Sequence, residues 1–292
     1  MPKILGVGPK PDAHYDGYRT DNGRSLSLYM GFPRIALSER PITPCGKSAR
    51  PTGRDIAVNF SKTGLPLDNR LLASLPRDHF DRLLPHVSTV LLPQGDVLVE
   101  AGDEVDQVYF PHNGMLSLLA VLRDGKAIET ATVGREGVVG AMAGLGLYKS
   151  LVRVVVQMPL ACSRIAATHF RTVAATSDPV RNLCIRYNEV LLSQARVTAA
   201  CNALHSIEAR FCRWLLQCAD RASTDTISLT QEFLAEMLGV RRTSVTEVAS
   251  KMQSAGLITY SRGVIKILDR HALMRMSCEC YETLLDQSAI LA

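Results

Sequence analysis

One segment near the C-terminus constrains the fold more than any other, because residues 229–258 predict two short helices joined by a tight bend. The apolar residues of the first helix fall three and four positions apart, at Phe233, Leu234, Met237 and Leu238. Gly239 follows at the bend, where glycine adopts positive φ without a steric penalty. The second helix carries its own apolar stripe, formed by Val240, Val245, Val248 and Met252. The pattern predicts two helices that pack against each other through these residues.

The residues that follow predict a β-hairpin. Gly256 ends the second helix, and residues 259–268 alternate around a turn at Arg262 and Gly263. Helix pairs with this spacing occur in any helical domain, so the hairpin is what favours a winged helix-turn-helix.

This order of elements resembles the C-terminal domain of the Crp/Fnr superfamily of bacterial transcription regulators. The resemblance implies that the second helix enters the major groove of DNA. In that family an arginine near the start of this helix reads guanine, and Arg242 stands at its position. Thr243 and Glu247 stand where a family member carries glutamate and arginine, so the preferred DNA sequence should differ. The residues predicted to bind DNA are Arg241, Arg242, Thr243, Thr246, Glu247, Lys251 and Arg262.

Short strands are predicted upstream of this module. Residues 65–86 favour one or two short helices broken around Pro76. Runs rich in β-branched or aromatic residues then alternate with turn signals, at 87–91, 97–100, 105–110, 115–122 and 127–133. Their spacing indicates an antiparallel roll or sandwich. Residues 92–110 resemble the start of the cyclic-nucleotide-binding β-roll of the same superfamily.

The resemblance also locates an effector pocket, and the residues there are degenerate. Members that bind cyclic nucleotides carry a glutamate for the ribose and an arginine for the phosphate. The corresponding positions hold Val138, which cannot accept a hydrogen bond, and Lys149, which lacks the bidentate fork of arginine. Cyclic AMP is therefore not the expected effector, and a different anion, another small molecule or no ligand at all remain open. The predicted pocket residues are Gly137, Val138, Gly140, Lys149 and Ser150.

A long helix is predicted between roll and winged helix, starting at Asp178 and Pro179. A heptad register gives a nearly apolar a/d seam, formed by Val180, Leu183, Tyr187, Val190, Gln194, Val197, Cys201 and Leu204. This seam predicts a homodimer interface. The competing interpretation is that the seam packs against the roll of its own chain.

The expected fold class is α+β, with an antiparallel β-roll, a long dimerisation helix and a winged helix-turn-helix. The predicted parts are an N-terminal extension at 1–63, the roll at 64–176, the dimerisation helix at 177–205, the winged helix at 206–276 and a C-terminal tail at 277–292. Residues 1–63 hold 10 Lys/Arg against 5 Asp/Glu and account for the net charge of +5. This proline- and glycine-rich extension is expected to have little structure. Three interpretations of it remain open: it contacts DNA phosphates, it is an accessory segment, or the start codon is assigned too far upstream.

No cofactor or metal site is predicted from the eight cysteines. Iron–sulfur ligation needs four thiolates, and only Cys45 precedes the roll. Cys184, Cys201 and Cys212 fall on apolar helical positions and are interpreted as small buried hydrophobes. Cys278 and Cys280 are interpreted as too isolated for a zinc site, which usually takes four ligands in spaced pairs.

The sequence also argues against a membrane protein, a secreted protein and an enzyme. No apolar run reaches the length of a membrane span, and no secretion signal is found, so a cytoplasmic protein without membrane contact is expected. No catalytic motif indicates an enzyme. The expected partners are double-stranded DNA, a second copy of the chain and, by resemblance, RNA polymerase. The alternative is a ligand-sensing regulator whose winged helix binds a protein; the outward pair Arg241 and Arg242 favours DNA.

Overall fold

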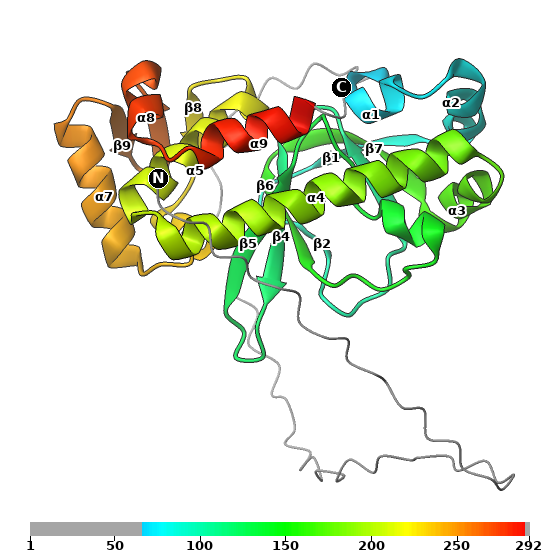
Figure 1. Cartoon of the computed structure of the whole chain (residues 1–292), viewed down its shortest axis with the longest axis horizontal. Helices are drawn as coiled ribbons and strands as arrows, with labels where there is room; N and C mark the ends of the chain where they lie inside the picture. Colours follow the sequence, from blue (N-terminus) through cyan, green and yellow to red (C-terminus); the bar gives the residue numbers. More distant parts are fainter. Residues whose placement is uncertain (1–65, 290–292) are drawn as a thin grey trace, which may run out of the picture. The chain divides into compact units, whose positions relative to one another are not determined.

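The computed structural model describes residues 66–289, shown in colour in Figure 1. The predicted extension at residues 1–63 lies outside the described residues. Four short helices come first, and Pro76 separates the second from the third, as the sequence predicts. They are η1 Pro66–Asp68, α1 Arg70–Ala73, α2 Arg77–Leu83 and η2 Leu84–His86. Asn69 caps α1 and also fastens it to the roll, because its Nδ2 donates to the carbonyls of Pro111 at 2.9 Å and Gly137 at 2.8 Å.

Antiparallel strands then form the roll as two facing sheets, with strand orders β1-β7-β3 and β2-β6-β4-β5. The strands are β1 Ser88–Leu92, β2 Val97–Val99, β3 Gln107–Pro111, β4 Met115–Val121, β5 Ala127–Val133, β6 Arg153–Met158 and β7 Leu160–Ala166, with the short helix η3 Ala141–Leu145 before β6. The first five agree with the predicted strands to within two residues. The antiparallel roll is therefore confirmed.

Helices α3 Ala167–Ala175 and α4 Asp178–Leu204 follow the roll. Ser177 caps α4 by accepting from the backbone N–H of Val180, and Pro179 occupies the first turn, where its missing N–H costs nothing. At 1.5 Å per residue α4 is about 40 Å long. Figure 1 shows it as the long green-to-yellow helix that runs past the strands.

The C-terminal domain is a winged helix-turn-helix, as predicted. Its elements are α5 Ile207–Ala222, β8 Thr226–Ser228, α6 Gln231–Leu238, α7 Arg242–Ser254, β9 Ile258–Ser261, β10 Val264–Ile267, α8 Arg270–Met276 and α9 Cys280–Ala289. Strands β9 and β10 form the wing, and β8 completes the sheet in the order β8-β10-β9. The residues predicted only as a tail contain α9, which buries Tyr281 and Leu284. Helix α9 packs on α4 and α5 and so belongs to the folded structure.

The sheet that contains β4 and β5 has both faces covered. Leu116 and Leu118 belong to the core of the roll, whereas Met115 and Leu119 belong to the core of the C-terminal domain. A strand covered on both faces is expected to be apolar along most of its length, and Ser117 is the one polar residue of β4.

A buried polar contact joins the same sheet to α5. Trp214 Nε1 donates to Glu129 Oε1 at 2.8 Å, and Ser117 Oγ donates to Glu129 Oε2 at 2.6 Å. Burial raises the pKa of the Glu129 carboxyl. These hydrogen bonds fix the position of α5, which carries the helix-turn-helix, against the roll.

Candidate functional site

The bend between α6 and α7 depends on Gly239 in two ways. Its φ of 62° lies in the left-handed region, which glycine adopts without strain. A Cβ built there would come within 2.6 Å of Ile128 Cδ1 on strand β5. The glycine therefore lets α7 turn back across α6 and lets the bend lie close to the roll.

Helix α7 buries one face and exposes the other. Val245, Val248 and Met252 are buried as predicted, and Val240 is half-buried. The opposite face carries the predicted DNA-binding side chains, which are all exposed: Arg241, Arg242, Thr243, Thr246, Glu247 and Lys251. The structure thus presents these residues together to an outside partner.

The basic residues of this face have acidic neighbours. Arg242 Nη1 lies 2.6 Å from Glu232 Oε1, and both side chains are about 60% exposed, at 62% and 61%. Lys251 Nζ lies 3.3 Å from Glu208 Oε1. Exposed ion pairs of this kind contribute only about 0–1 kcal/mol. A ligand that contacts either cation can therefore displace its acidic neighbour.

The wing brings a further arginine to the start of α7. Arg262 and Gly263 both have positive φ, 50° and 76°, as the two-residue turn between β9 and β10 requires. Arg262 and Arg242 line one open groove, together with Gln231, Glu232 and Tyr260. The predicted site is thus one continuous surface at the start of α7 and the wing, while Lys251 lies at the far end of the helix.

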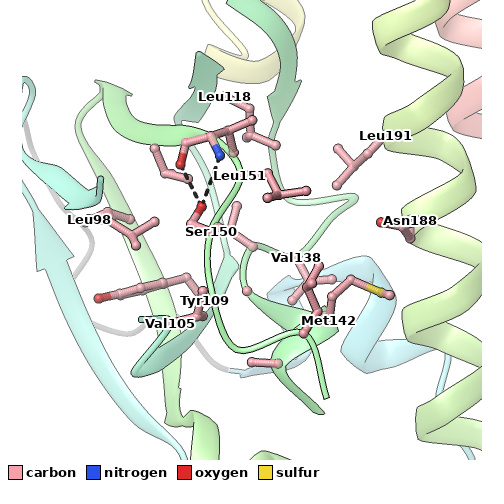
Figure 2. Close-up of a pocket in the computed structure, with 18 of the residues that line it drawn as sticks. Leu98, Val105, Tyr109, Leu118, Val138, Met142, Ser150, Leu151, Asn188 and Leu191 are labelled. Atoms are coloured by element: carbon pink, nitrogen blue, oxygen red, sulfur yellow. Dashed lines mark hydrogen bonds between the residues drawn. The ribbon is translucent and has the colours of Figure 1, made fainter. Parts of the chain in front are cut away.

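The roll contains a cavity of about 410 Å³ next to α4. Figure 2 shows its mostly apolar lining, with Val105, Tyr109 and Leu118 from the roll and Leu191 from α4. Four of the five predicted pocket residues line it: Val138, Gly140, Lys149 and Ser150.

Gly137, the fifth predicted pocket residue, does not line this cavity. A Cβ built on it would lie 1.8 Å from Tyr187 Oη and 2.7 Å from Val133 Cγ1. Gly137 therefore lets Tyr187 of α4, which itself lines the cavity, pack closely on the roll.

The charged side chains that line the cavity are mostly acidic. The Ser150 hydroxyl donates to the carbonyl of Val152 at 2.6 Å and accepts from its N–H at 3.3 Å, as Figure 2 shows. The charged lining residues are two carboxylates, Glu104 and Asp106, and one ammonium, Lys149. A cyclic phosphate would meet more negative than positive charge here, and Val138 offers its ribose no acceptor.

The predicted dimer seam packs against its own chain. Six of its members are at most 8% exposed in the single chain: Val180, Leu183, Tyr187, Val190, Gln194 and Cys201. Gln194 Oε1 accepts from the backbone N–H of Thr132 in β5 at 3.2 Å. Val197 is half-buried against Cys201, and only Leu204 is exposed, at 78%. For the six buried members, assigning the seam to a second copy was therefore wrong: five of them cover the roll, as the competing interpretation had it, and Cys201 packs against Cys278 and Cys280. For Val197 and Leu204 the assignment stays a prediction.

A different face of α4 is open. Ile185, at 56% exposed, and Leu192, at 42%, lie seven residues apart, and the exposed Ala199 continues the same spacing. Sequence periodicity could not reveal this stripe, because the more apolar seam beside it gives the stronger signal.

Four residues that the sequence did not connect lie together at the end of α4. Cys201, His205, Cys278 and Cys280 place their ligand atoms within 4.8 Å of one another. The isolation expected for Cys278 and Cys280 is not found, because the segment between α8 and α9 returns to α4. Cys201 is buried, as expected, in a small cluster with Cys278 and Cys280 that is separate from the cores of the roll and the C-terminal domain.

Comparisons with known proteins agree with both domains. The family model described as cyclic nucleotide-binding domain matches residues 89–177, and that described as Crp-like helix-turn-helix domain matches residues 209–276. Together these spans cover more than half of the chain. The sequence matches no curated protein.

Two solved structures show the likeness of the whole arrangement. A Crp/Fnr-family transcriptional regulator from Thermus thermophilus is 20% identical, with a TM-score of 0.55 over 65% of this chain and 98% of its own. The global regulator CLP of Xanthomonas campestris, described as responsive to c-di-GMP, is 16% identical, with a TM-score of 0.56 over 66% of this chain and 100% of its own. At these identities the structures support the fold.

Proposed function

Because the chain belongs to the Crp/Fnr superfamily of transcriptional regulators, we propose that it reads DNA as a dimer through α7 and its wing. The observation that carries this proposal is the shared groove of Arg242 and Arg262 on an exposed face of the helix-turn-helix. The exposed width of such a helix fits a major groove about 12 Å wide. We propose that the regulator acts in the cytoplasm and that RNA polymerase is a further partner. The proposed function includes no catalytic activity.

The energetics favour guanine as the target of Arg242. A bidentate contact between arginine and guanine discriminates by about 1–3 kcal/mol. The exposed pair with Glu232 is worth about 0–1 kcal/mol, so exchanging one contact for the other is favourable. Thr243 and Glu247 are the next base readers, and Arg241, Lys251 and Arg262 are proposed as phosphate contacts.

The test is selection of bound sequences from a random duplex library, followed by mobility-shift assays on the recovered sites. A two-fold repeated site with half-sites about one helical turn apart is the expected result. If the selection enriches no sequence and the winged helix binds a protein, the alternative of a protein-docking winged helix is supported.

The partner surface on α4 is proposed to be the open stripe of Ile185, Leu192 and Ala199. Their seven-residue spacing suits a two-stranded coiled coil. Leu192 also lines the cavity of the roll, so a second copy packed there lies beside any bound effector.

No helix within residues 66–289 combines the length and apolarity that crossing a bilayer demands.

The effector proposed for the cavity is a largely apolar molecule, and cyclic AMP is expected to bind weakly or not at all. The reason is the missing acceptor at Val138 and the two carboxylates, Glu104 and Asp106, that line the cavity with Lys149. Calorimetry with the full chain and cyclic AMP should show no binding in the low-micromolar range, and DNA affinity should not change when cyclic AMP is added. Low-micromolar binding would contradict this prediction.

If an anionic compound does bind, Lys149→Ala should weaken it more than Lys126→Ala. Lys126 is a suitable control because it is an exposed lysine whose ammonium pairs with Asp124 at 2.7 Å, away from the cavity.

A further inference from the structure

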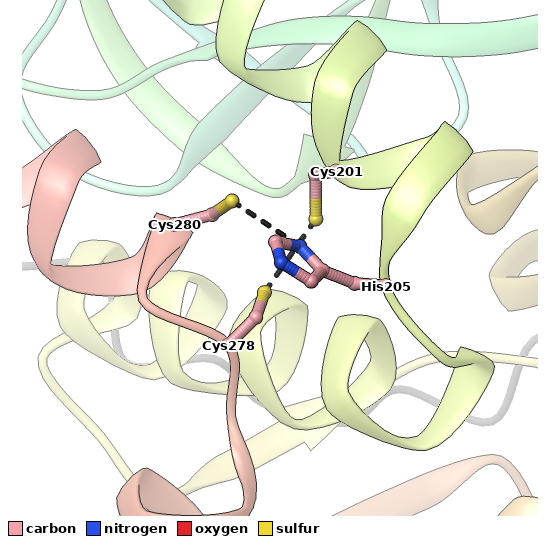
Figure 3. Close-up of side chains that lie close together, drawn as sticks. All are labelled: Cys201, His205, Cys278 and Cys280. Atoms are coloured by element: carbon pink, nitrogen blue, oxygen red, sulfur yellow. Dashed lines mark hydrogen bonds between the residues drawn. The ribbon is translucent and has the colours of Figure 1, made fainter.

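The cluster at the end of α4 combines two pairs of ligand residues from distant parts of the chain. Cys201 lies in the last turn of α4, and His205 is its C-cap, four residues on and so on the same face. Cys278, 77 residues beyond Cys201, lies in the short segment between α8 and α9, and Cys280 is the first residue of α9. Figure 3 shows all four side chains pointing toward one centre.

The spacing of the donor atoms matches a single tetrahedral ion. Cys201 Sγ lies 3.5 Å from Cys278 Sγ, and Cys280 Sγ lies 3.5 Å from His205 Nδ1. Zinc binds thiolate at ≈ 2.3 Å and imidazole at ≈ 2.0–2.1 Å, so the edges of a zinc tetrahedron are about 3.6–3.8 Å. An iron–sulfur cluster sets several metal and sulfide atoms between its ligands and needs wider spacing than four donors within 4.8 Å.

A carboxylate next to the cluster orients the histidine. His205 Nε2 lies 3.1 Å from Glu279 Oε1. A proton held on Nε2 by this carboxylate leaves the Nδ1 lone pair directed at the three sulfur atoms. Zinc-bound histidines commonly have such a partner, which fixes the tautomer and strengthens the ligand.

The three cysteines are buried, and the charges of Arg210 and Arg213 act on Cys201. Cys201, Cys278 and Cys280 are at most 7% exposed. Arg210 and Arg213 are themselves buried, and the Nε atom of each has no hydrogen-bond partner. Three thiolates around a divalent cation leave one net negative charge, which these guanidinium groups can balance.

We propose that Cys201, His205, Cys278 and Cys280 bind one zinc ion in a closed Cys₃His site. Four protein ligands leave no open position, so the ion is structural. It ties the start of α9 to the junction between α4 and α5, since Ser206, which caps α5, follows His205 directly. The zinc thereby sets the angle at which the C-terminal domain leaves α4.

The first experiment measures metal content. The full chain, produced in zinc-supplemented medium and purified without chelator, should contain about one zinc per chain by elemental analysis. Cys201→Ala should lose it. Cys184→Ala is the matched control, because Cys184 is also a buried cysteine of α4 but lies in the core of the roll, and this variant should keep its zinc.

Cobalt identifies the ligands. Co²⁺ added to the metal-free full chain should give the visible absorption of a tetrahedral ion and a thiolate charge-transfer band. Both should disappear in Cys280→Ala and return in Cys280→His, which restores a ligand. Glu279→Gln should keep the tetrahedral spectrum but bind zinc about 10- to 100-fold more weakly.

The proposal is overturned by any of three results. One is less than a tenth of an equivalent of zinc after reconstitution under reducing conditions; another is equal zinc in Cys201→Ala and Cys184→Ala. The third is a Cys201–Cys278 disulfide, or iron with sulfide, as the form of the protein isolated from cells.

Chelator should also lower the melting temperature of the Cys184→Ala variant but not that of Cys201→Ala.

Discussion

Replacing Arg242 with alanine should lower the affinity for the selected DNA site about 30-fold to 10⁴-fold. Each half-site loses a bidentate guanine contact worth about 1–3 kcal/mol, and a dimer makes two of them. The loss should be confined to one base position of each half-site, because the variant no longer distinguishes guanine there. Mobility-shift titrations against every single-base substitution of the site measure both effects.

Lys251→Ala is the matched comparison, since Lys251 is an exposed cation at the other end of the same helix. Its loss should weaken all sequences alike and flatten the salt dependence by about two units of slope, one for each subunit of the dimer. If Arg242→Ala also weakens all sequences equally, Arg242 is only a phosphate anchor and the base-reading role is wrong.

Replacing Ile185 and Leu192 together with aspartate should convert the protein to a folded monomer. Both side chains are exposed in the single chain, so the charges cost little until a second helix buries them. Loss of the linked second half-site should then reduce DNA affinity about 10²- to 10⁴-fold, the usual gain from two tethered sites. Sedimentation velocity measures the assembly and circular dichroism the fold.

Val190→Asp is the control that distinguishes a residue of the proposed dimer interface from a residue of the core. Val190 is 8% exposed within its own chain, so its aspartate variant should unfold or melt at a much lower temperature instead of giving a stable monomer. A wild-type protein that is monomeric at micromolar concentration would refute the dimer interface, as would a double variant that remains dimeric.

The parts of the fold with local signals were predictable. The helix pair around Gly239, the hairpin turn at Arg262 and the first five strands all depend on periodicity and turn residues within about ten positions. The exposed side of α7 followed directly, because a helix with one apolar stripe presents its other residues outward.

The parts that depend on distant contacts were not predictable. A heptad pattern states which side of α4 is apolar, but it does not say whether a second copy or the roll covers that side. The pairing of Cys278 and Cys280 with Cys201 and His205 depends on how α9 returns to α4, which no short window records. Gly137 was assigned to the pocket by its position in a motif, whereas its closest neighbour is Tyr187.

Strand β4 limits how the two domains can evolve. Its even-numbered residues Leu116 and Leu118 pack inside the roll, and its odd-numbered residues Met115 and Leu119 pack on the helix-turn-helix domain. Since side chains alternate along a strand, a one-residue insertion or deletion in β4 that no β-bulge absorbs would move every residue beyond it to the opposite face. The strand should therefore tolerate substitution far better than any change of length, and insertions should accumulate in the flanking loops instead.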